Sequence, residues 1–522
     1  MRLHDFLDYR AREQAEAEFA IHGDRRITYR QAQVEVHRLA NALVSCGFQP
    51  GDRMAILSKN SIEYMLLYFA ASKAGLVPVP LNFRLAPAEW SYILNDAEVK
   101  ILFAASGYLP DVETIRTELK TIHQFIAMDG AETPGWETYQ RLLADQPDTS
   151  PNHNASPEDD LFQLYTSGTT GHPKGAILTH RAVTTHVLQM GLAHNIQPGE
   201  RLLLVAPIFH VAALNAGAFP CLAAGGCLYI QENFKPDEVV RALSEAHINV
   251  GLLVPAMIQA CLTAVPDVAQ RRYDELRLIH YGASPIAEAT LRRAIDVFKC
   301  EFSQGYGMTE MTAAIAILSW ADHQRALRQK PELLVAAGRP ILGTDVRVVD
   351  ENDNDVPHGT IGEVLARGPQ MMKGYWKQPE ATAEALRGGW MHTGDAGVLD
   401  DEGYLYIQDR VKDMVVSGGE NIYPRVVEEV LFKHLAVAEV AVIGVPDEQW
   451  GETIKAVVVL RPGMTSTAEE IIDFCRGKLG GFERPHSVDF VDSLPRTPSG
   501  KVLKRVLREP YWEGQSRRVA GV

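Results

Sequence analysis

The chain has 522 residues, of which 46% are hydrophobic and 22% are charged, and its formal net charge is −15. This composition excludes a disordered or fibrous protein, and the length favours more than one domain. The acidic balance argues against a general affinity for nucleic acid or anionic membranes, so an anionic ligand would have to be bound by local positive groups.

The six cysteines lie far apart and form no C-x-x-C pair, which argues against a zinc ribbon or a disulfide framework and indicates a reducing compartment. Residues 1–20 have the pattern of an amphipathic helix and lack the apolar centre of a signal peptide. No apolar run reaches the roughly 18 residues of a membrane span. We therefore expect a cytoplasmic protein without a transmembrane segment; a homodimer is expected only because dimers are common.

Most of the chain up to residue 409 alternates short apolar strands with amphipathic helical stretches. The expected strands are Met54–Leu57, Ile101–Ala104, Leu202–Ala206, Val250–Val254 and Leu276–Tyr281, and the expected helices include Ser61–Lys73 and Pro236–Ala246. This alternation predicts an α/β fold of layered sheets and helices with buried parallel strands. Ligands of such sheets bind at the loops beyond the carboxyl ends of the strands.

The pattern changes near Asp395, where residues rich in Gly, Asp and Tyr predict short hairpins. From residue 414 the expected elements form a small α+β unit: strands Met414–Val416, Val440–Val445 and Lys455–Leu460, with helices Arg425–Lys433 and Ala468–Lys478. We therefore predict a large domain over residues 1–409, a hinge at 410–413, and a small mobile domain over 414–522.

The segment Thr166–Gly175 reads TSGTTGHPKG and lies between two apolar strands, Leu161–Tyr165 and Ala176–Thr179. It is not a Walker A loop, because proline precedes Lys174 and glycine follows it. Its glycines expose backbone N–H groups, its hydroxyls can donate, and Lys174 adds a positive charge, so its chemistry is that of a phosphate cradle. On local chemistry alone, a flexible loop without a ligand is the alternative.

Further motifs follow in order along the chain. They are Tyr306–Glu310 (YGMTE), Trp390–Asp395 (WMHTGD), Asp409–Asp413 (DRVKD), Ser417–Pro424 (SGGENIYP) and Pro495–Lys501 (PRTPSGK). Together with TSGTTGHPKG, this ordered set resembles the adenylate-forming enzymes, which include acyl-CoA synthetases, the adenylation domains of peptide synthetases, and firefly luciferase. The resemblance covers nearly the whole chain. It implies that a carboxylate attacks ATP to give an acyl-adenylate and pyrophosphate, and that a thiol, usually that of coenzyme A, then displaces AMP.

The resemblance implies a site for the ATP triphosphate in the TSGTTGHPKG loop. Thr309 would lie at the α-phosphate, and Glu310 with Thr166 would bind Mg²⁺, a cation that prefers oxygen ligands. On its own, Glu310 would be read as a solvated acid at the start of a helix. The expected phosphate-binding residues are Thr166, Ser167, Gly168, Thr169, Thr170 and Lys174.

The resemblance also implies an adenosine site. Tyr306 would present its ring to adenine, although a lone tyrosine more often packs in a core. Asp395 would accept hydrogen bonds from the ribose hydroxyls, with Arg410 nearby. The remaining residues expected to surround the nucleotide are Gly282, Ala283, Ser284, Gln304, Gly305, Gly307, Met308 and Ile407.

The small domain carries the residue that the resemblance identifies as the adenylation lysine, Lys501. Lys412 stands at the family's hinge position, and rotation there would withdraw Lys501 after adenylation. Gly419 would then let the pantetheine arm pass close to the backbone. Phe482 and Arg484 match positions that contact the CoA nucleotide in some relatives, and His486 stands where a lysine is common.

The sequence says less about the acyl substrate than about the nucleotide site. By resemblance, His210 lies beside the substrate carboxylate, whereas a lone histidine is more often a satisfied core or surface residue. The runs Val211–Ala218 and Ala313–Ala316 are small, apolar and free of cationic residues, which favours a roomy apolar channel. Because alanine runs also pack helices together, this pocket is a hypothesis.

Several functions stay open at this stage. We expect an AMP-forming acyl-CoA ligase for a medium- or long-chain fatty acid, with a hydroxycinnamate-CoA or other aryl acid-CoA ligase as the alternative. A luciferase-like oxygenase would share the adenylation step, and a peptide-synthetase adenylation domain usually adjoins a carrier domain. A non-catalytic nucleotide sensor would be expected to lack Lys501, Glu310 or Asp395, and all three are present.

Overall fold

The computed structural model describes residues 1–151, 153, 155–166, 173–284, 286, 288–410, 413–417, 420–447, 450–496 and 502–513, apart from the side chains of residues 409, 410, 416, 420 and 421. The fold is a mixed α/β arrangement, as the sequence predicts. Within the described residues, no helix combines the length and the apolar character that crossing a membrane would require.

The first sheet has five strands, and all of its pairings are parallel. The order across the sheet is β4 (Val77–Pro80), β3 (Arg53–Leu57), β5 (Ile101–Ala104), β6 (Gln124–Ala127) and β7 (Glu137–Thr138). Strand β5 is buried along its whole length, and β3 is buried from Met54 to Leu57, which explains the apolar runs in both strands.

The second sheet has nine strands, and the carboxyl ends of some of them lie in the candidate active site. Its order is β16 (Arg339–Pro340), β15 (Ala316–Leu318), β14 (Glu301–Tyr306), β13 (Leu278–Gly282), β12 (Val250–Leu253), β10 (Arg201–Leu204), β11 (Cys227–Ile230), β1 (Glu18–His22) and β2 (Arg25–Thr28). The run from β14 to β1 is parallel, whereas β15, β16 and β2 add antiparallel edges.

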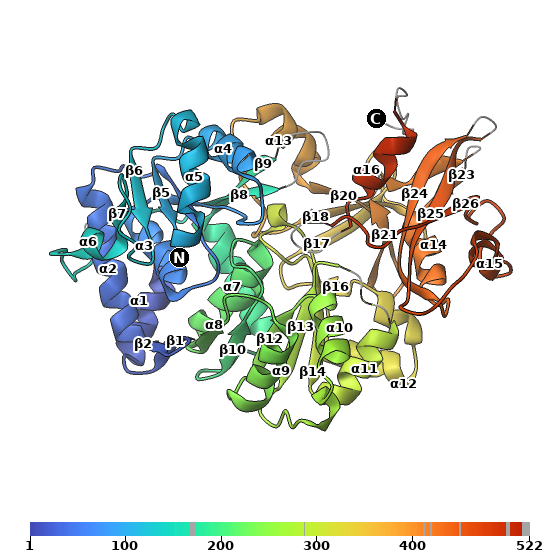
Figure 1. Cartoon of the computed structure of the whole chain (residues 1–522), viewed down its shortest axis with the longest axis horizontal. Coiled ribbons are helices and arrows are strands. Elements are labelled where there is room, and N and C mark those ends of the chain that lie inside the picture. Colours follow the sequence, from blue (N-terminus) through green and yellow to red (C-terminus); the bar gives the residue numbers. More distant parts are fainter. Residues whose placement is uncertain are drawn as a thin grey trace.

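Helices separate and cover these two sheets in layers (Figure 1). The layer between the sheets contains α1 (Leu3–Glu13), α2 (Tyr29–Ser45), α3 (Ile62–Ala74), α6 (Tyr139–Leu143), α7 (His180–Ala193) and α8 (Phe219–Ala224). The outer face of the five-stranded sheet packs on α4 (Pro87–Asp96) and α5 (Leu109–Ile115). The outer face of the nine-stranded sheet packs on α9 (Pro236–Glu245), α10 (Pro255–Ala264), α11 (Glu288–Phe298) and α12 (Trp320–Arg328).

Helix α3 shows how the sequence produces this layering. The Ser61 hydroxyl accepts a hydrogen bond from the Tyr64 N–H, which caps the first turn, and Gly75 ends the helix in a left-handed conformation with φ of 78°. Between these caps nearly every residue is buried. A helix that is apolar on all sides is stable only inside a core, and here it lies between the two sheets.

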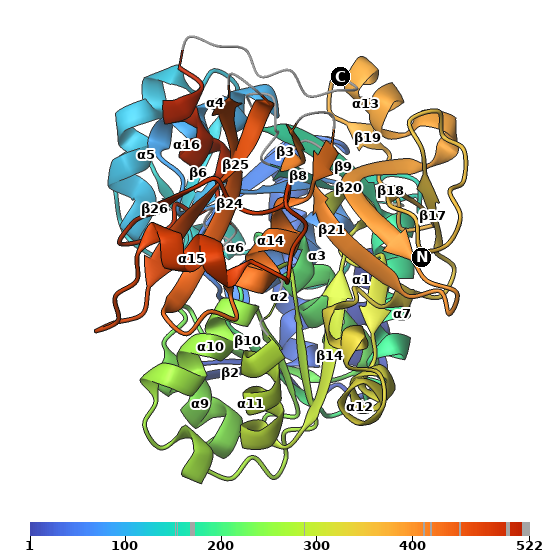
Figure 2. The same ribbon diagram turned by 90° about the vertical axis from the view of Figure 1, so that its right-hand side faces the viewer.

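Two smaller sheets lie beside the carboxyl ends of the nine-stranded sheet (Figure 2). One is antiparallel, in the order β19 (Gly374–Tyr375), β9 (Lys174–Thr179) and β8 (Asp160–Thr166), next to α13 (Pro379–Ala385). The other is the antiparallel group β17 (Asp345–Val349), β18 (Gly362–Arg367), β20 (Met391–Leu399) and β21 (Leu405–Arg410). The last pair is the hairpin that the Gly- and Asp-rich segment predicts.

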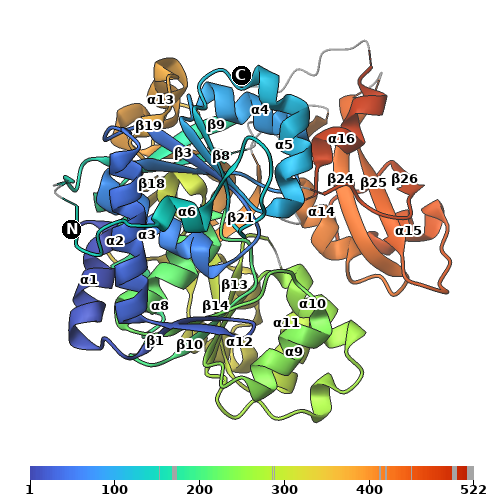
Figure 3. The same ribbon diagram turned by 60° about the vertical axis from the view of Figure 1, so that its left-hand side comes forward.

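The C-terminal elements form a small α+β lobe at one side of the molecule (Figure 3). It contains β22 (Val415–Ser417), β23 (Glu420–Ile422), α14 (Pro424–Leu431), β24 (Val437–Asp447), β25 (Gly451–Leu460), α15 (Ala468–Phe474), β26 (Ser487–Phe490) and α16 (Lys504–Arg508). The helix predicted over Ala468–Lys478 is too long. It ends at Phe474, and Gly477 then takes a left-handed φ of 72°, which turns the chain.

Candidate active site

The predicted phosphate loop is the connection of an antiparallel hairpin. Strand β8 ends at Thr166, strand β9 begins at Lys174, and these two residues are paired across the hairpin. The Thr166 Oγ1 atom lies 3.5 Å from both the Lys174 carbonyl oxygen and Glu310 Oε1. The two ends of the loop therefore meet beside Glu310. The loop residues Ser167, Gly168, Thr169 and Thr170 lie outside the described residues.

Glu310 is the buried carboxylate of the site, with 6% of its surface exposed. Its Oε1 accepts a hydrogen bond of 2.9 Å from the hydroxyl of Tyr375, and its backbone carbonyl accepts one of 2.8 Å from the Met372 N–H. The Lys174 Nζ lies 5.2 Å from the centre of the Tyr375 ring. Tyr375 is a residue that sequence reasoning missed, because its place depends on the pairing of β19 with β9.

These oxygens suit Mg²⁺. A buried carboxylate beside a threonine hydroxyl offers hard ligands, and Mg²⁺ commonly takes one or two carboxylates together with phosphate oxygens and water. Across the described ranges, no group of three or more His, Cys, Asp and Glu side chains could hold a metal by itself. Glu310 and Thr166 therefore fit an ion that a phosphate ligand brings with it.

The other end of the site is formed by Tyr306 and Asp395. The Tyr306 hydroxyl donates a hydrogen bond of 2.6 Å to Asp395 Oδ2, and Asp395 is buried with 6% exposed. Asp395 lies on β20 opposite Arg410 on β21, so the pairing brings the two predicted ribose residues together. Tyr306 and Ile407 pack against one small apolar cluster, which fixes the Tyr306 ring beside β21.

Glycines allow the close backbone approaches in this region. Gly282 and Gly305 are paired at the carboxyl ends of β13 and β14, and a Cβ on Gly282 would lie 2.3 Å from the Gly305 carbonyl oxygen. A Cβ on Gly307 would lie 1.9 Å from the Ala313 carbonyl oxygen. Ala283, the residue after Gly282, has a φ of 66° and turns the chain sharply. Side chains at Gly282 and Gly307 would therefore strike neighbouring backbone and displace the segment that carries the predicted nucleotide residues.

The other predicted nucleotide residues lie along the same strand and turn. Gln304 donates through Nε2 to the Ala336 carbonyl oxygen at 3.3 Å, which ties β14 to the neighbouring segment. Met308 packs against the main core and precedes a short 3₁₀ turn, η5 (Thr309–Met311). This turn carries Thr309 and Glu310, and Ser284 follows Ala283 beyond β13.

His210 lies after β10, half-buried, and its Nε2 is a buried atom that makes no hydrogen bond among the described residues. Burial, with a smaller contribution from the charge of Arg84, lowers the pKa of His210 to about 4. The imidazole is therefore neutral at physiological pH. A neutral ring can exchange hydrogen bonds with a carboxylate without the cost of burying a second charge.

The two small apolar runs that the sequence singles out are brought together. Residues Ala212–Ala218 form a π-helix, η3, and the buried Asn215 donates through Nδ2 to the Thr312 carbonyl oxygen at 3.0 Å. Side chains of η3 and of Ala313–Ile315 belong to one buried cluster. Single-turn π-helices often occur at functional sites.

The CoA-related predictions are covered only partly by the described residues. Phe482 is 45% exposed, and Arg484 is half-buried with an Nε that makes no hydrogen bond in the described structure. His486 is exposed. Gly419, Lys412 and Lys501 lie outside the described residues, as does the side chain of Arg410.

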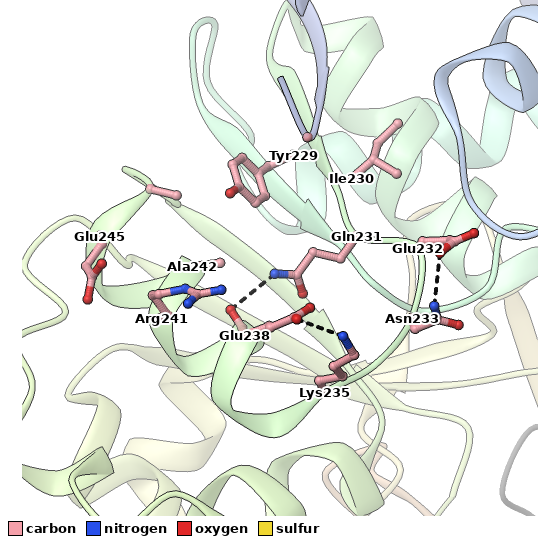
Figure 4. Close-up of a pocket in the computed structure, with 12 residues that line it drawn as sticks. Tyr229, Ile230, Gln231, Glu232, Asn233, Lys235, Glu238, Arg241, Ala242 and Glu245 are labelled. Carbon is pink, nitrogen blue, oxygen red and sulfur yellow. Dashed lines mark hydrogen bonds and ion pairs between the residues drawn. The ribbon is translucent and has the colours of Figure 1, made fainter. Parts of the chain in front are cut away.

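A polar surface pocket of about 490 Å³ lies elsewhere, beside β11 and α9 (Figure 4). Its polar groups largely satisfy one another: Gln231 Nε2 donates to the Glu238 carbonyl oxygen, Lys235 pairs with the Glu238 carboxylate, and Asn233 donates to Glu232. None of the predicted site residues lines this pocket.

Two family models match most of this chain. The family model for AMP-binding enzymes matches residues 7–376, and the model for the C-terminal domain of AMP-binding enzymes matches residues 426–501. The chain is 38% identical to a fatty acid–[acyl-carrier-protein] ligase, ScoC, of Streptomyces coeruleorubidus, over 95% of this chain and 93% of the relative. It is also 38% identical to a feruloyl-CoA synthase of Amycolatopsis, over 96% of this chain and 97% of the relative.

The fold is similar to that of ATP-bound MatB from Rhodopseudomonas palustris. The TM-score is 0.89 at 30% identity, and the match covers 98% of this chain and 99% of the solved chain.

We expect Gly307→Ala to weaken nucleotide binding strongly and to lower stability by about 1–3 kcal/mol, because the Ala313 carbonyl that its Cβ would strike is backbone and cannot move aside. Gly191→Ala is the matched control. Gly191 lies within α7, and a Cβ there would meet no atom within 4 Å, so this change should stabilise by about 0.5–1 kcal/mol. Chemical denaturation and binding of an ATP analogue by calorimetry measure both effects. Normal binding by Gly307→Ala would contradict the close approach.

Buried histidines lie close to the predicted nucleotide residues, and they should make the free energy of unfolding depend on pH. The His186 Nε2 accepts a hydrogen bond of 3.2 Å from the Ala314 N–H, and burial lowers the pKa of His186 and of His280 to about 4. The unfolded chain binds protons as the pH falls through about 6.5, while the folded protein cannot, so stability is complete above that pH and is lost below it.

We therefore expect the free energy of unfolding to fall by about 1–2 kcal/mol per such histidine between pH 7 and pH 5, measured by urea denaturation. His186→Gln, which cannot titrate, should show a smaller decline, whereas the exposed His123→Gln should decline as the parent does. Equal stability of the parent at both pH values would contradict this account.

Proposed function

This chain belongs to the AMP-binding enzyme family as an AMP-forming acid–thiol ligase of the acyl- and aryl-CoA ligase type, and we propose that its substrate is a medium- or long-chain fatty acid. The small apolar side chains of η3 and of Ala313–Ile315 support an apolar acyl group, as does the relative named as a fatty acid ligase. The relative named as a feruloyl-CoA synthase keeps a hydroxycinnamate or another aryl acid as the alternative.

One observation supports the ATP-dependent adenylation step of this proposal. A single short segment, β14 followed by η5, places Tyr306 against Asp395 at one end and Glu310 beside Thr166 at the other. The first pair suits a nucleoside, and the second suits a phosphate chain with its cation. The segment therefore has the layout required to align ATP, with the α-phosphate near Thr309 between the two ends.

The residues would divide the first step among them. Lys174 and the loop after Thr166 would hold the phosphates that leave as pyrophosphate, and Mg²⁺ held by Glu310 would neutralise part of their charge. The neutral His210 would orient the substrate carboxylate through its Nε2. Lys501, from the small domain, would stabilise the charge that develops as the carboxylate attacks the α-phosphate.

The thiol step would follow a rotation about the segment joining the two domains. Asp413 forms an ion pair of 3.0 Å with Arg508, so the residue just after Lys412 is tied to the small lobe. This supports a hinge within residues 410–413, with domains at 1–409 and 414–522. Gly419, Phe482 and Arg484 would then guide CoA to the acyl-adenylate.

The compartment is also a proposal. All six cysteines are free thiols, and an acidic chain with free thiols fits the cytoplasm. ATP and CoA are abundant substrates there, so the proposed activity needs no export.

The substrate is tested with a panel of acids. Purified protein is given ATP, Mg²⁺ and CoA with acids from acetate to palmitate, and with cinnamates and benzoates, while AMP and pyrophosphate are measured. We expect the largest kcat/KM for a medium- or long-chain fatty acid. Highest turnover with a cinnamate would favour the aryl alternative, and AMP formation with none of the acids would overturn the ligase proposal. An acyl carrier protein in place of CoA tests the thiol acceptor.

The role of Lys501 is tested by separating the two half-reactions. Lys501→Ala should lower acid-dependent ATP–pyrophosphate exchange by about 10²–10³-fold, because a donor to the developing charge is lost. Thioester formation from supplied acyl-adenylate and CoA should change little. Lys504→Ala is the control, since Lys504 follows Lys501 closely in the sequence but pairs with Glu428 inside the small lobe. An equal loss in both half-reactions would contradict the proposal that Lys501 acts only in adenylation and is withdrawn before thioester formation.

A further inference from the structure

The segment around β19 joins the phosphate hairpin to the turn that carries Glu310. On one side the Trp376 N–H donates to the Gly175 carbonyl oxygen at 2.8 Å, next to Lys174 in β9. On the other side the Met372 N–H donates to the Glu310 carbonyl oxygen, also at 2.8 Å. Residues 372–376 therefore form a backbone bridge between two parts of the site that are far apart in sequence.

Tyr375 lies in the middle of this bridge, and its side chain contacts charged groups of opposite sign. Its hydroxyl donates to Glu310 Oε1 at 2.9 Å, and the Lys174 Nζ lies 5.2 Å from the centre of its ring. A hydroxyl that donates a hydrogen bond to a carboxylate restrains the orientation of that carboxylate, and an aromatic face within about 6 Å attracts an ammonium group. One half-buried side chain thus acts on both groups.

The bridge is held firmly from behind. The Tyr375 N–H donates to the Oγ1 of Thr382, a residue in the middle of α13, at 2.9 Å. The Trp376 Nε1 donates to the Asp96 carbonyl oxygen at 2.9 Å, and the Arg53 guanidinium lies 3.7 Å from the centre of the Trp376 ring. These contacts anchor the segment to α13 and to the layer of the five-stranded sheet. Tyr375 consequently has little freedom to follow Glu310 or Lys174 if either group moves.

We propose that Tyr375 is a positioning residue that holds the carboxylate of Glu310 and the ammonium group of Lys174 in the arrangement that receives the metal-bound triphosphate. This inference rests on the proposed function, because it assigns Glu310 to the cation and Lys174 to the phosphates. Glutamate and lysine side chains have several rotatable bonds, and ordering them when the ligand arrives would weaken binding. Tyr375 orders both beforehand, by its hydroxyl and by its ring respectively.

Because hydroxyl and ring act on different groups, two substitutions separate them. Tyr375→Phe removes the bond to Glu310 and keeps the ring beneath Lys174. We expect the Mg²⁺ concentration needed for half-maximal binding of a non-hydrolysable ATP analogue to rise about tenfold, because a hydrogen bond to a charged group is lost. Binding of the analogue in EDTA should remain within about twofold. Tyr375→Leu should also weaken binding in EDTA, by about three- to fivefold.

The matched control is Tyr404→Phe. The Tyr404 hydroxyl donates to the Asp322 carboxylate outside the site, so the same phenol–carboxylate bond is lost without any contact to Glu310 or Lys174. We expect its Mg²⁺ dependence and its analogue binding to match the parent. Thermal unfolding of the ligand-free proteins compares the two phenylalanine variants for stability.

A double-mutant cycle tells positioning from a general structural effect. If Tyr375 acts through Glu310, then Tyr375→Phe should not change the Mg²⁺ dependence further in a Glu310→Gln background. The proposal would be overturned if Tyr375→Phe raised the Mg²⁺ requirement by the same factor in the Glu310→Gln background as in the parent. It would also be overturned if the Tyr375→Phe protein had the Mg²⁺ dependence of the parent. Failure of the parent to bind the analogue at all would instead overturn the proposed function, so the two failures are distinguishable.

Discussion

The site depends on a single short link, the path from Tyr306 through the η5 turn to Glu310. At one end of the link Tyr306 is bonded to Asp395, and at the other Glu310 is bonded to Tyr375. The two partner side chains, Asp395 and Tyr375, come from β20 and β19, which belong to two other sheets. The local geometry of one short segment therefore sets the spacing between the proposed nucleoside site and the proposed metal–phosphate site.

The η5 turn is held in place by buried hydrogen bonds at its C-terminal end. Thr312, directly after the turn, has a φ of 62°, a conformation that a threonine holds only when its surroundings enforce it. Its hydroxyl donates to the Gln370 carbonyl oxygen at 2.5 Å, and its own carbonyl accepts from Asn215 in the π-helix. The residues proposed to hold the acid and those proposed to hold the metal thus share one buried support.

The sequence was informative where local chemistry decides the structure. Apolar runs located β3 and β5 to within a residue, and the Gly-rich loop and the YGMTE and WMHTGD motifs identified both ends of the candidate site. It could not reveal Tyr375. A tyrosine after glycine has no distinctive pattern, and its meaning arises from antiparallel pairing of β19 with β9 across roughly two hundred residues, a long-range contact without a local signal. The π-helical form of Ala212–Ala218 was hidden for a similar reason, since an alanine-rich run is compatible with ordinary helical packing.

The charges of the described site support the proposal that the small domain moves during the reaction. An acid approaching ATP brings one anion against another, and His210, the group proposed to contact the acid, is neutral because burial lowers its pKa to about 4. Lys174 lies at the far end, over Tyr375. A cation at the α-phosphate stabilises the charge of the adenylation transition state. Under the proposed function, Lys501 would be carried on a lobe that rotates about the hinge, so it would be present for the first step and withdrawn for the second, while the nucleotide frame would stay in place.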